Sequence, residues 1–445
     1  MAASNALTYR MPNLVPIRRS PAFLRNPTTF VIFGATAAFC TYACMYAFRR
    51  GITAVTFEGI FFAGISYKIW LVTAQVFGYA VSKGIGVKVV SEMSPGRRAI
   101  NILLFVGVAL LALLAFALVP APWNIIFLFL NGLPLGLVYG TMLGFLEGRR
   151  QTDALVAGLT ASFIFASGFV KTVALTIKSA WGISEFWLPF VTGSLFVLPM
   201  LVSIYALTLL PPPTAEDRAL RTERKPMDSS ERGSFVRNFR PGLVLLILSY
   251  VLLSAFRDFR DNFGPEILKD AGVENPGIFA KTETMVAVGI LVVMALLQRV
   301  INNFRAFTLL NGLMLTGGAM VGLSTYSYST GWLSPGNWFL LTGLGLYMAY
   351  VPCNGLYFER LIASFRYVST VGFIVTLADW YGYLGSVAVL LYKNFGHATI
   401  SYREFFINGA YIMAAFYVVL VVASYIYFRA RFRNEATRQA LANAM

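Results

Sequence analysis

Apolar blocks of roughly 20 residues, separated by short polar segments, run through almost the whole chain. A helix of this length crosses the hydrocarbon core of a bilayer, which is about 30 Å thick. Of the 445 residues, 57% are hydrophobic and only 13% are charged, a balance outside the range of soluble domains. Membrane β-strands would be shorter and would alternate in polarity. The pattern therefore predicts an all-α membrane protein.

Twelve apolar blocks are found, six before a polar interval and six after it. The interval starts with three prolines and is rich in arginine, so it is too polar to cross a membrane. We expect an amino-terminal arm at 1–29, six-helix bundles at 30–210 and 241–428, a basic linker at 211–240 and a tail at 429–445. The expected helices are 30–48, 67–88, 100–119, 123–146, 154–177, 186–210, 242–257, 282–297, 307–326, 338–358, 368–392 and 405–428.

The positive charge of the chain is concentrated on one side of the expected spans. Arginine and lysine gather in the arm, the alternate loops, the linker and the tail, which accounts for much of the net charge of +16. Such loops face the cytoplasm, so both termini should be cytoplasmic in a multi-pass protein of a bacterial inner membrane. The chain has no stripe of basic residues with interleaved aromatic residues, so nucleic acid is not expected as a partner.

The two expected bundles resemble each other. A Tyr-x4-Ala-Phe-Arg motif ends at Arg49 and again, 208 residues later, at Arg257. A second similarity joins 144–147 to 356–359 at an offset of 212. The nearly constant offset indicates duplicated halves, related by an axis along the membrane normal.

Signs of an enzyme or a metal site are lacking in the sequence. The three cysteines all lie in apolar blocks, and the single histidine, His397, cannot form a metal site alone. No paired-histidine signature, phosphate-binding glycine loop or nucleophile elbow is present. We therefore expect no catalytic residues, no metal and no cofactor.

Arg49 and Arg257 are the leading candidates for a binding site. Each lies toward the outer end of its span, where positive charge is otherwise sparse. They could extend to the external headgroups. Their matching positions in two symmetric halves instead favour an arrangement across the central axis, where two guanidinium groups could clamp a phosphate or carboxylate.

Three more ionisable residues lie within expected spans, where each is costly to bury. Lys83 and Lys171 could contact a substrate, pair with a buried acid or extend to the interface. Asp379 could couple transport to protons or could be the structural partner of a buried cation. An ion pair is not by itself evidence of function, so both interpretations of Asp379 stay open.

Aromatic residues near these positions could line a central cavity. The candidates are Tyr42, Tyr46, Trp380 and Tyr383. Aromatic residues are frequent in this chain, and packing toward lipid is the alternative for each of them.

Charged residues also mark the cytoplasmic ends of two spans. Glu147, Arg149, Glu359 and Arg360 could form ion pairs that gate the transporter, or could act only as topology signals.

Several motifs resemble those of a known family. The run Tyr46-Ala47-Phe48-Arg49-Arg50 resembles the tyrosine-x-x-arginine-lysine signature of the organophosphate:phosphate antiporters, a branch of the major facilitator superfamily. The stretches 79–83 and 91–97 are similar to the second span and following loop of that branch. Arg257 resembles its seventh-span arginine, and Gly382-Tyr383-Leu384-Gly385 resembles a glycine-rich stretch of its eleventh span.

The resemblance implies that Arg49 and Arg257 bind a substrate phosphate and that Lys83 assists them. One feature departs from the family. Its fifth-span histidine has no counterpart near 164–165, and the same span carries Lys171 instead.

The leading hypothesis is a monomeric secondary transporter that moves a small organic anion through the bilayer by alternating access. An organophosphate exchanged for phosphate is one version of it. Proton-coupled symport of a carboxylate or sugar acid through Asp379 is an alternative. A membrane sensor that binds its ligand without moving it is another.

Overall fold

The computed structural model describes residues 21–444 apart from 92, 147–148, 150, 213–228, 274, 276, 299, 301, 355, 366–370 and 397–399. His397, Glu147 and most of the expected arm and linker therefore lie outside the described residues.

The first half of the chain is helical, with one small hairpin. Its helices are α1 (Pro27–Arg50), α2 (Tyr67–Ser91), α3 (Arg98–Leu118), α4 (Ile125–Leu146), α5 (Thr152–Trp181), α6 (Leu188–Leu195) and α7 (Val197–Thr208), with short 3₁₀ turns η1 (Ala22–Arg25), η2 (Gly51–Ala54) and η3 (Pro95–Arg97). The hairpin joins β1 (Phe61–Phe62) to β2 (Ile65–Ser66), which are antiparallel.

The second half is built in the same way. Its helices are α9 (Ser229–Asp270), α10 (Gly277–Gln298), α11 (Asn303–Ser329), α12 (Pro335–Tyr350), α13 (Leu356–Ser364), α14 (Val371–Leu391) and α15 (Tyr402–Ala444), with the turn η4 (Val351–Asn354) and the π-helical turn η5 (Tyr392–Gly396). A proline is the first residue of α1 and α12 and the second residue of α6. Helix α1 is capped by Asn26, whose side chain accepts a 2.9 Å hydrogen bond from the backbone nitrogen of Thr28.

By length and hydropathy, eight helices in the described residues could cross a membrane, or up to ten if each bent pair, α6–α7 and α12–α13, forms one span. The all-α membrane class is thus as expected, although this test finds fewer spans than twelve. The other two expected spans correspond to α2 and α14. Polar residues such as Gln75 and Lys83 interrupt the apolar surface of α2. In α14 the side chains of 371–373 and 376 lie outside the described residues, which leaves the apolar stretch Leu377–Leu391.

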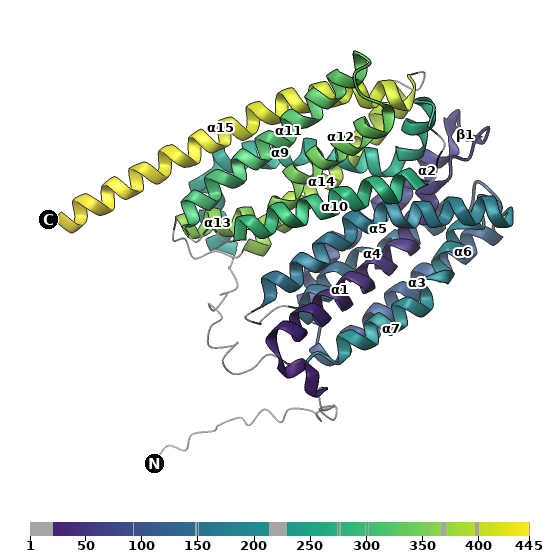
Figure 1. The fold of residues 1–445 in the computed structure, drawn as a ribbon, viewed down its shortest axis with the longest axis horizontal. Coiled ribbons are helices and arrows are strands. Elements are labelled where there is room, and N and C mark those ends of the chain that lie inside the picture. The colour runs from purple at the N-terminus through teal and green to yellow at the C-terminus, as the bar shows by residue number, and fades with distance from the viewer. Residues whose placement is uncertain are drawn as a thin grey trace.

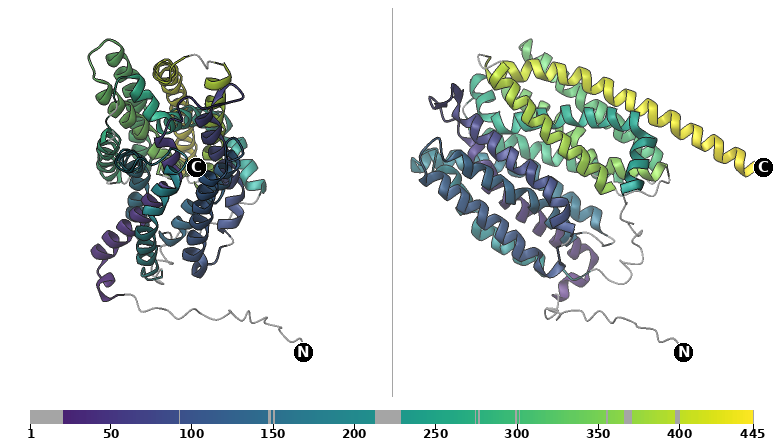
Figure 2. Two further views of the ribbon diagram at one scale, coloured as in Figure 1. Left: turned by 90° about the vertical axis from the view of Figure 1, so that its right-hand side faces the viewer. Right: turned by 180° about the vertical axis from the view of Figure 1, so that it is seen from behind.

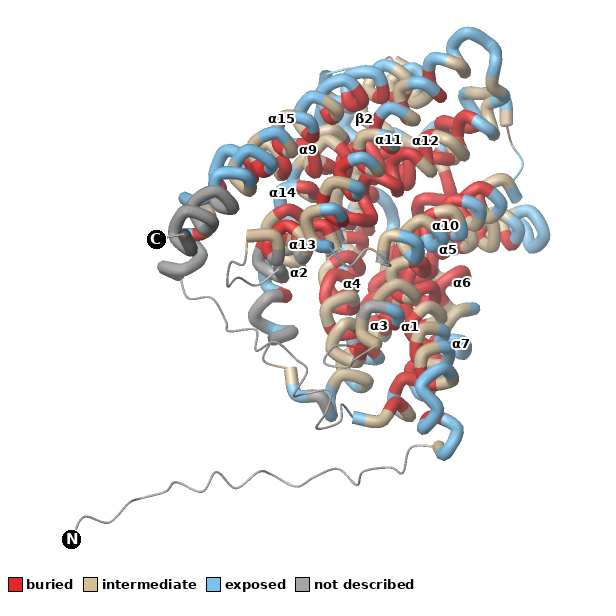
Figure 3. Tube along the Cα trace, turned by 60° about the vertical axis from the view of Figure 1, so that its left-hand side comes forward, coloured by how far each residue is buried: buried red, intermediate tan, exposed pale blue. Residues whose placement is uncertain are grey.

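The two halves lie side by side (Figure 1, purple to teal-blue against green to yellow), and the view from behind in Figure 2 (right) shows the same arrangement. Two helix pairs join them. In one, α5 packs against α10, and in the other α2 packs against α14. Buried residues concentrate where helices face each other (Figure 3). Large apolar side chains elsewhere, such as those of Leu111 and Val419, are exposed. Such faces suit contact with lipid.

The seventh expected helix is longer at both ends than its apolar block. Helix α9 begins at Ser229, inside the segment expected to be linker, and runs past residue 257 to Asp270. Its last part carries Arg257, Asp258, Arg260, Asp261 and Glu266, all buried. The expected end at 257 was wrong because these polar side chains find partners inside the protein, as described below.

We name the two ends of the bundle by their landmarks. The hairpin end contains η2, the β1–β2 hairpin and the carboxyl end of α9. The linker end contains the carboxyl end of α7 and the amino end of α9. The loop charges predict that the linker end is cytoplasmic.

Candidate functional site

Arg49 lies at the carboxyl end of α1 and is buried, with 6% of its surface exposed. Its guanidinium carbon lies 4.1 Å from the centre of the Tyr79 ring on α2. Gln75 fixes the backbone here, because its Nε2 donates to the carbonyl oxygen of Arg49 at 3.2 Å. In the described part of the chain, no carboxylate forms an ion pair with the Arg49 guanidinium. Arg49 is thus a buried cation held by an aromatic ring.

Arg257, the equivalent residue in the second half, is also buried but carries its own counterion. Its Nη2 lies 2.6 Å from Oδ1 of Asp258, and Nε donates to the same oxygen at 3.2 Å. The other oxygen of Asp258 accepts from the Ser386 hydroxyl of α14 at 2.7 Å. The Tyr350 ring lies 3.7 Å from the guanidinium carbon. The two arginines therefore share an aromatic contact but differ in charge balance.

Lys83 and Asp379 form an ion pair between the halves. Nζ of Lys83 on α2 lies 3.6 Å from Oδ2 of Asp379 on α14, and both side chains are about four-fifths buried. The Tyr250 hydroxyl donates to Oδ1 of Asp379 at 2.5 Å. Each carboxylate oxygen of Asp379 thus has a partner.

Tyrosine rings surround these charged groups and repeat between the halves. The ring centres of Tyr42 and Tyr139 lie 5.5 Å apart. Tyr250 is the equivalent of Tyr42 in the second half, and its ring centre lies 5.4 Å from that of Tyr350. Tyr42 also contacts Tyr46 at 5.5 Å. Tyr42 and Tyr46 thus lie beside each other near Arg49, and their role in lining a cavity stays a prediction.

The aromatic group crosses between the halves where Tyr79 of α2 meets Tyr383 of α14, with ring centres 5.1 Å apart. Trp380 lies apart from it, since that side chain is 42% exposed and contacts its neighbour Tyr381. We call the charged and aromatic set the central group: Arg49, Lys83, Arg257, Asp258, Asp379 and the tyrosines 42, 46, 79, 139, 250, 350 and 383.

A second set of buried charges lies toward the hairpin end. We call it the hairpin-end network; its members are Arg50, Lys68, Lys171, Arg260, Asp261, Asn262, Glu266 and Glu283. Arg50 of α1 contacts α9 twice, at Asp261 (Nη2–Oδ2, 3.4 Å) and at Asn262 (Nη1–Oδ1, 2.6 Å). Lys68 of α2 pairs with Glu266 of α9.

Within the second half, Arg260 completes this network. Its Nη1 lies 2.7 Å from Oε1 of Glu283 and 3.5 Å from Oδ1 of Asp261, and its Nη2 donates to the Phe339 carbonyl at 3.0 Å. The Tyr347 hydroxyl donates to Asp261 Oδ2 at 2.9 Å. Lys171, expected to be a substrate contact, lies in this network and not in the central group.

Sequence reasoning missed the other seven members of the hairpin-end network. A signal was available, because the polar residues 258, 261, 262, 266 and 269 recur at helical spacing. That spacing predicts a continuous helix with one polar face, opposite the extra cations Arg50 and Lys68.

The gating candidates are described only in part, because the side chain of Glu359 also lies outside the described residues. Arg149 donates from Nη1 to the Pro211 carbonyl at 2.5 Å, and Arg360 donates from Nη1 to Asn303 at 2.7 Å. Each of these contacts stays within one half. In the described part of the chain, the ion pairs between halves lie at the hairpin end or in the central group, so the hairpin end is closed.

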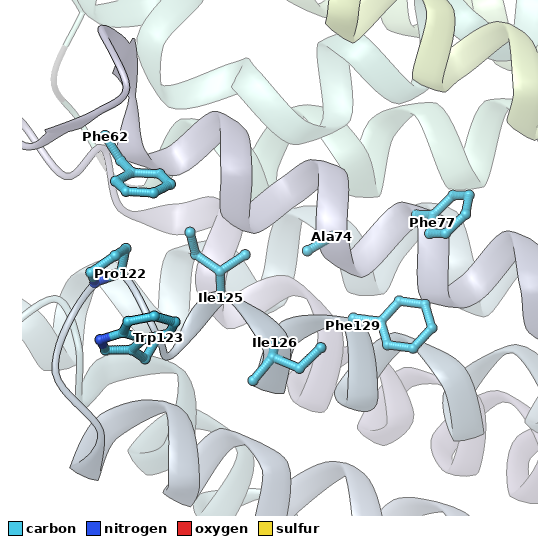
Figure 4. A pocket seen from close by; sticks show the side chains of 8 residues that line it. All are labelled: Phe62, Ala74, Phe77, Pro122, Trp123, Ile125, Ile126 and Phe129. Atoms are coloured by element: carbon cyan, nitrogen blue, oxygen red, sulfur yellow. The ribbon is translucent and has the colours of Figure 1, made fainter.

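An apolar groove of about 550 Å³ opens on the outer surface of α2 and α4. Phe62, Phe77, Trp123, Ile126 and Phe129 are among its lining residues, and Figure 4 shows that they project into it. Its lining is apolar, so it offers no group that would bind an anion.

Several solved structures with a similar fold are transporters. A bacterial homologue of the human drug peptide transporters PepT1 and PepT2 matches with a TM-score of 0.59 and 12% identity, over 90% of this chain and 99% of the other. A bacterial homologue of the human lysosomal transporter Spinster, inward-facing and unoccupied, gives 0.56 and 15%, over 90% and 97%. The xylose transporter XylE from E. coli, partially occluded and inward open, gives 0.55 and 16%, over 88% and 97%.

These matches confirm the expected fold class, the two-bundle fold of the major facilitator superfamily. At such low identity they show the fold alone, and they lend no support to the organophosphate branch. A family model, a family of unknown function designated DUF5690, matches residues 51–431, so the chain belongs to that family. No curated protein matches the chain.

Proposed function

We propose that this protein is a secondary transporter that carries a small organic anion between its two halves by alternating access, with Arg49 as the main anion-binding residue. The fold supports transport, because the solved structures that match it include transporters for peptides and for xylose. The closed hairpin end is consistent with one of the states that alternating access requires.

One observation carries the choice of an anion. Arg49 is a buried arginine between the halves that has no carboxylate partner in the described residues, whereas the other arginine of the central group has one. A buried charge without a partner is costly, so its retention favours a role in binding. A guanidinium group offers several hydrogen-bond donors in one plane, which suit a carboxylate or phosphate.

The charges of the central group bear on the kind of anion. Arg49, Lys83 and Arg257 are three cations, and Asp258 and Asp379 are two carboxylates, so one positive charge remains. A ligand group with a single negative charge would balance it. This favours a carboxylate or a singly charged phosphate ester over the dianion that two free arginines would suit.

The symmetric two-arginine clamp is revised in this proposal. Arg257 would bind the ligand only after Asp258 releases it, so Arg49 acts first and Arg257 second. The tyrosine rings would pack against the organic part of the ligand, since they combine an apolar face with a polar tip. Exchange of an organophosphate for phosphate remains one version, supported by the motif around Arg49.

The Lys83–Asp379 pair favours a second candidate, proton-coupled symport of a carboxylate. Protonation of Asp379 would break an ion pair that joins the halves at 3.6 Å, and so would link proton binding to their separation. Uptake driven by an imposed pH gradient and lost in Asp379→Asn would support this candidate. Counterflow without any proton dependence would argue against it.

The test is uptake into proteoliposomes of labelled glycerol-3-phosphate, hexose phosphates, inorganic phosphate and small monocarboxylates. We expect saturable uptake of at least one of these anions, and its loss in the double variant Arg49→Ala/Arg257→Ala. Anion uptake that survives both substitutions would refute the assigned site. Specific binding of an anion with no uptake would show a sensor instead of a carrier.

A further inference from the structure

Lys171 differs from the other cations of the hairpin-end network. Only 2% of its surface is exposed, and no hydrogen bond or ion pair joins its Nζ to any other described residue. The centre of the Phe279 ring of α10 lies 5.5 Å from its Nζ. The ammonium form would therefore be buried without an acceptor.

Glu283 of α10 faces α5 from the other half, across the interface that we call the α5–α10 seam. Its Oε1 accepts from Arg260 at 2.7 Å, but its Oε2 has no hydrogen-bond partner among the described residues. Helix α5 approaches α10 very closely here. A Cβ added to Gly168, one turn before Lys171, would lie 2.4 Å from Cγ of Glu283 and 2.3 Å from the Phe279 carbonyl oxygen. Lys171 and Glu283 thus lie on facing helices, close to the point where α5 and α10 pack tightly.

The network is electrically balanced only when Lys171 is neutral. Arg50 pairs with Asp261, Arg260 with Glu283, and Lys68 with Glu266, which sets three cations against three carboxylates. A protonated Lys171 would add one positive charge in a region shielded from water, where an unpaired charge is strongly unfavourable.

The charged groups that act on Lys171 come from every side of the seam. They are Asp261 and Arg260 of α9, Arg50 of α1 and Glu283 of α10. All four are engaged in the ion pairs described above. Both carboxylates pair with an arginine, and neither forms a hydrogen bond with Lys171 while the hairpin end stays closed.

We propose that Lys171, opposite Glu283 on the α5–α10 seam, is a proton-binding site that links proton uptake to opening of the hairpin end. This rests on the proposed transport function and names its coupling ion. In the closed state Lys171 is a neutral amine. When α5 and α10 separate, water reaches Nζ and its lone pair takes a proton to form an N–H bond. On closing, that N–H bond breaks and the proton returns to water, so one proton is bound and released per cycle.

The experiment measures opening directly and needs no transported ligand. Spin labels are attached at Glu58→Cys and Lys269→Cys, two exposed residues on opposite halves whose side chains pair at 2.5 Å. The three native cysteines are replaced, and the distance distribution in lipid nanodiscs is recorded by pulsed electron resonance in mildly acidic and mildly alkaline buffer.

We expect the ratio of open to closed molecules to rise as pH falls, by up to about tenfold per pH unit, because one proton is linked to opening. The matched control is Lys171→Met, a neutral side chain of similar length, which should remain closed at every pH. Lys178→Met, the same change at a partly exposed lysine of α5 that pairs with Glu185 within one half, should respond like the parent.

Two results would overturn the proposal: a parent protein whose distances do not change with pH, or a Lys171→Met variant that responds equally. Both are independent of anion uptake. If opening does not depend on pH, the proposed anion site at Arg49 still stands. If no anion is taken up, the proposed pH-driven opening still stands.

Discussion

Arg50 and Asp261 tie the two halves together near the hairpin end: Nη2 lies 3.4 Å from Oδ2, and both side chains are about 4% exposed. Arg50 comes from the last turn of α1, and Asp261 lies in the polar part of α9 that the hydropathy pattern had not assigned to a helix. The pair thus joins the first and seventh helices of the expected repeat.

Breaking this pair should be costly. In Arg50→Met the Asp261 carboxylate loses one of its cations while staying buried, and we expect a loss of about 3–5 kcal/mol in the free energy of unfolding. Thermal unfolding in detergent is the measurement. The control is Lys269→Met, which removes an exposed pair with Glu58 and should cost less than about 1 kcal/mol. Equal losses in the two variants would contradict a special role for Arg50.

Lys83 and Asp379 should be coupled energetically. A double-mutant cycle with Lys83→Met and Asp379→Asn should give an interaction of about 1–3 kcal/mol, since contacting charged residues do not act additively. Stability of the purified protein is the readout. Additive effects within error would show that the 3.6 Å pair contributes nothing.

The ring of Tyr79 should matter more than its hydroxyl group. Tyr79→Phe keeps the aromatic face 4.1 Å from the Arg49 guanidinium, whereas Tyr79→Leu removes it. We expect Leu to weaken anion binding by about 0.5–2 kcal/mol through loss of the cation–π contact, with Phe close to the parent. Binding is followed as the rise in thermal stability with added anion. A larger loss of anion binding in Tyr79→Phe than in Tyr79→Leu would show that the hydroxyl group makes the contribution.

Close packing of α2 and α4 depends on Gly132. A Cβ at this position would lie 2.2 Å from the Gln75 carbonyl oxygen, so Gly132→Ala must push the helices apart. We expect it to destabilise the protein by about 1–3 kcal/mol. Gly107→Ala in α3 is the control, because a Cβ there meets no atom within 4 Å and alanine favours the helix. A Gly132→Ala protein as stable as the parent would show that α2 and α4 pack less closely than described.

The helical membrane fold followed directly from the sequence, because a bilayer imposes both length and polarity on each span. The repeat around Arg49 and Arg257 also pointed correctly to two halves. The end of α9 was wrong because hydropathy treats each polar residue as facing water. Asp261 and Glu266 instead face Arg50 and Lys68 from the other half, and a local pattern cannot reveal a partner about 200 residues away.

The same limit applies to the binding site. The motif predicted that Arg49 and Arg257 would be equivalent, and the sequence placed Asp258 next to Arg257, but only the folded structure shows that this carboxylate turns onto Arg257. Lys171 was grouped with the substrate residues because it lies in mid-span. Its distance from the central group depends on which face of α5 meets α10, which its position along the chain does not determine.

The central claim is that Arg49 is the anion-binding residue of a carrier. Counterflow tests it most directly: proteoliposomes loaded with an unlabelled anion that the uptake panel identifies should accumulate the labelled form. We predict that Arg49→Gln abolishes counterflow, while Arg360→Gln, the same change at an arginine bonded to Asn303 within one half, preserves it. Counterflow that persists in folded Arg49→Gln at the parental rate would contradict the account.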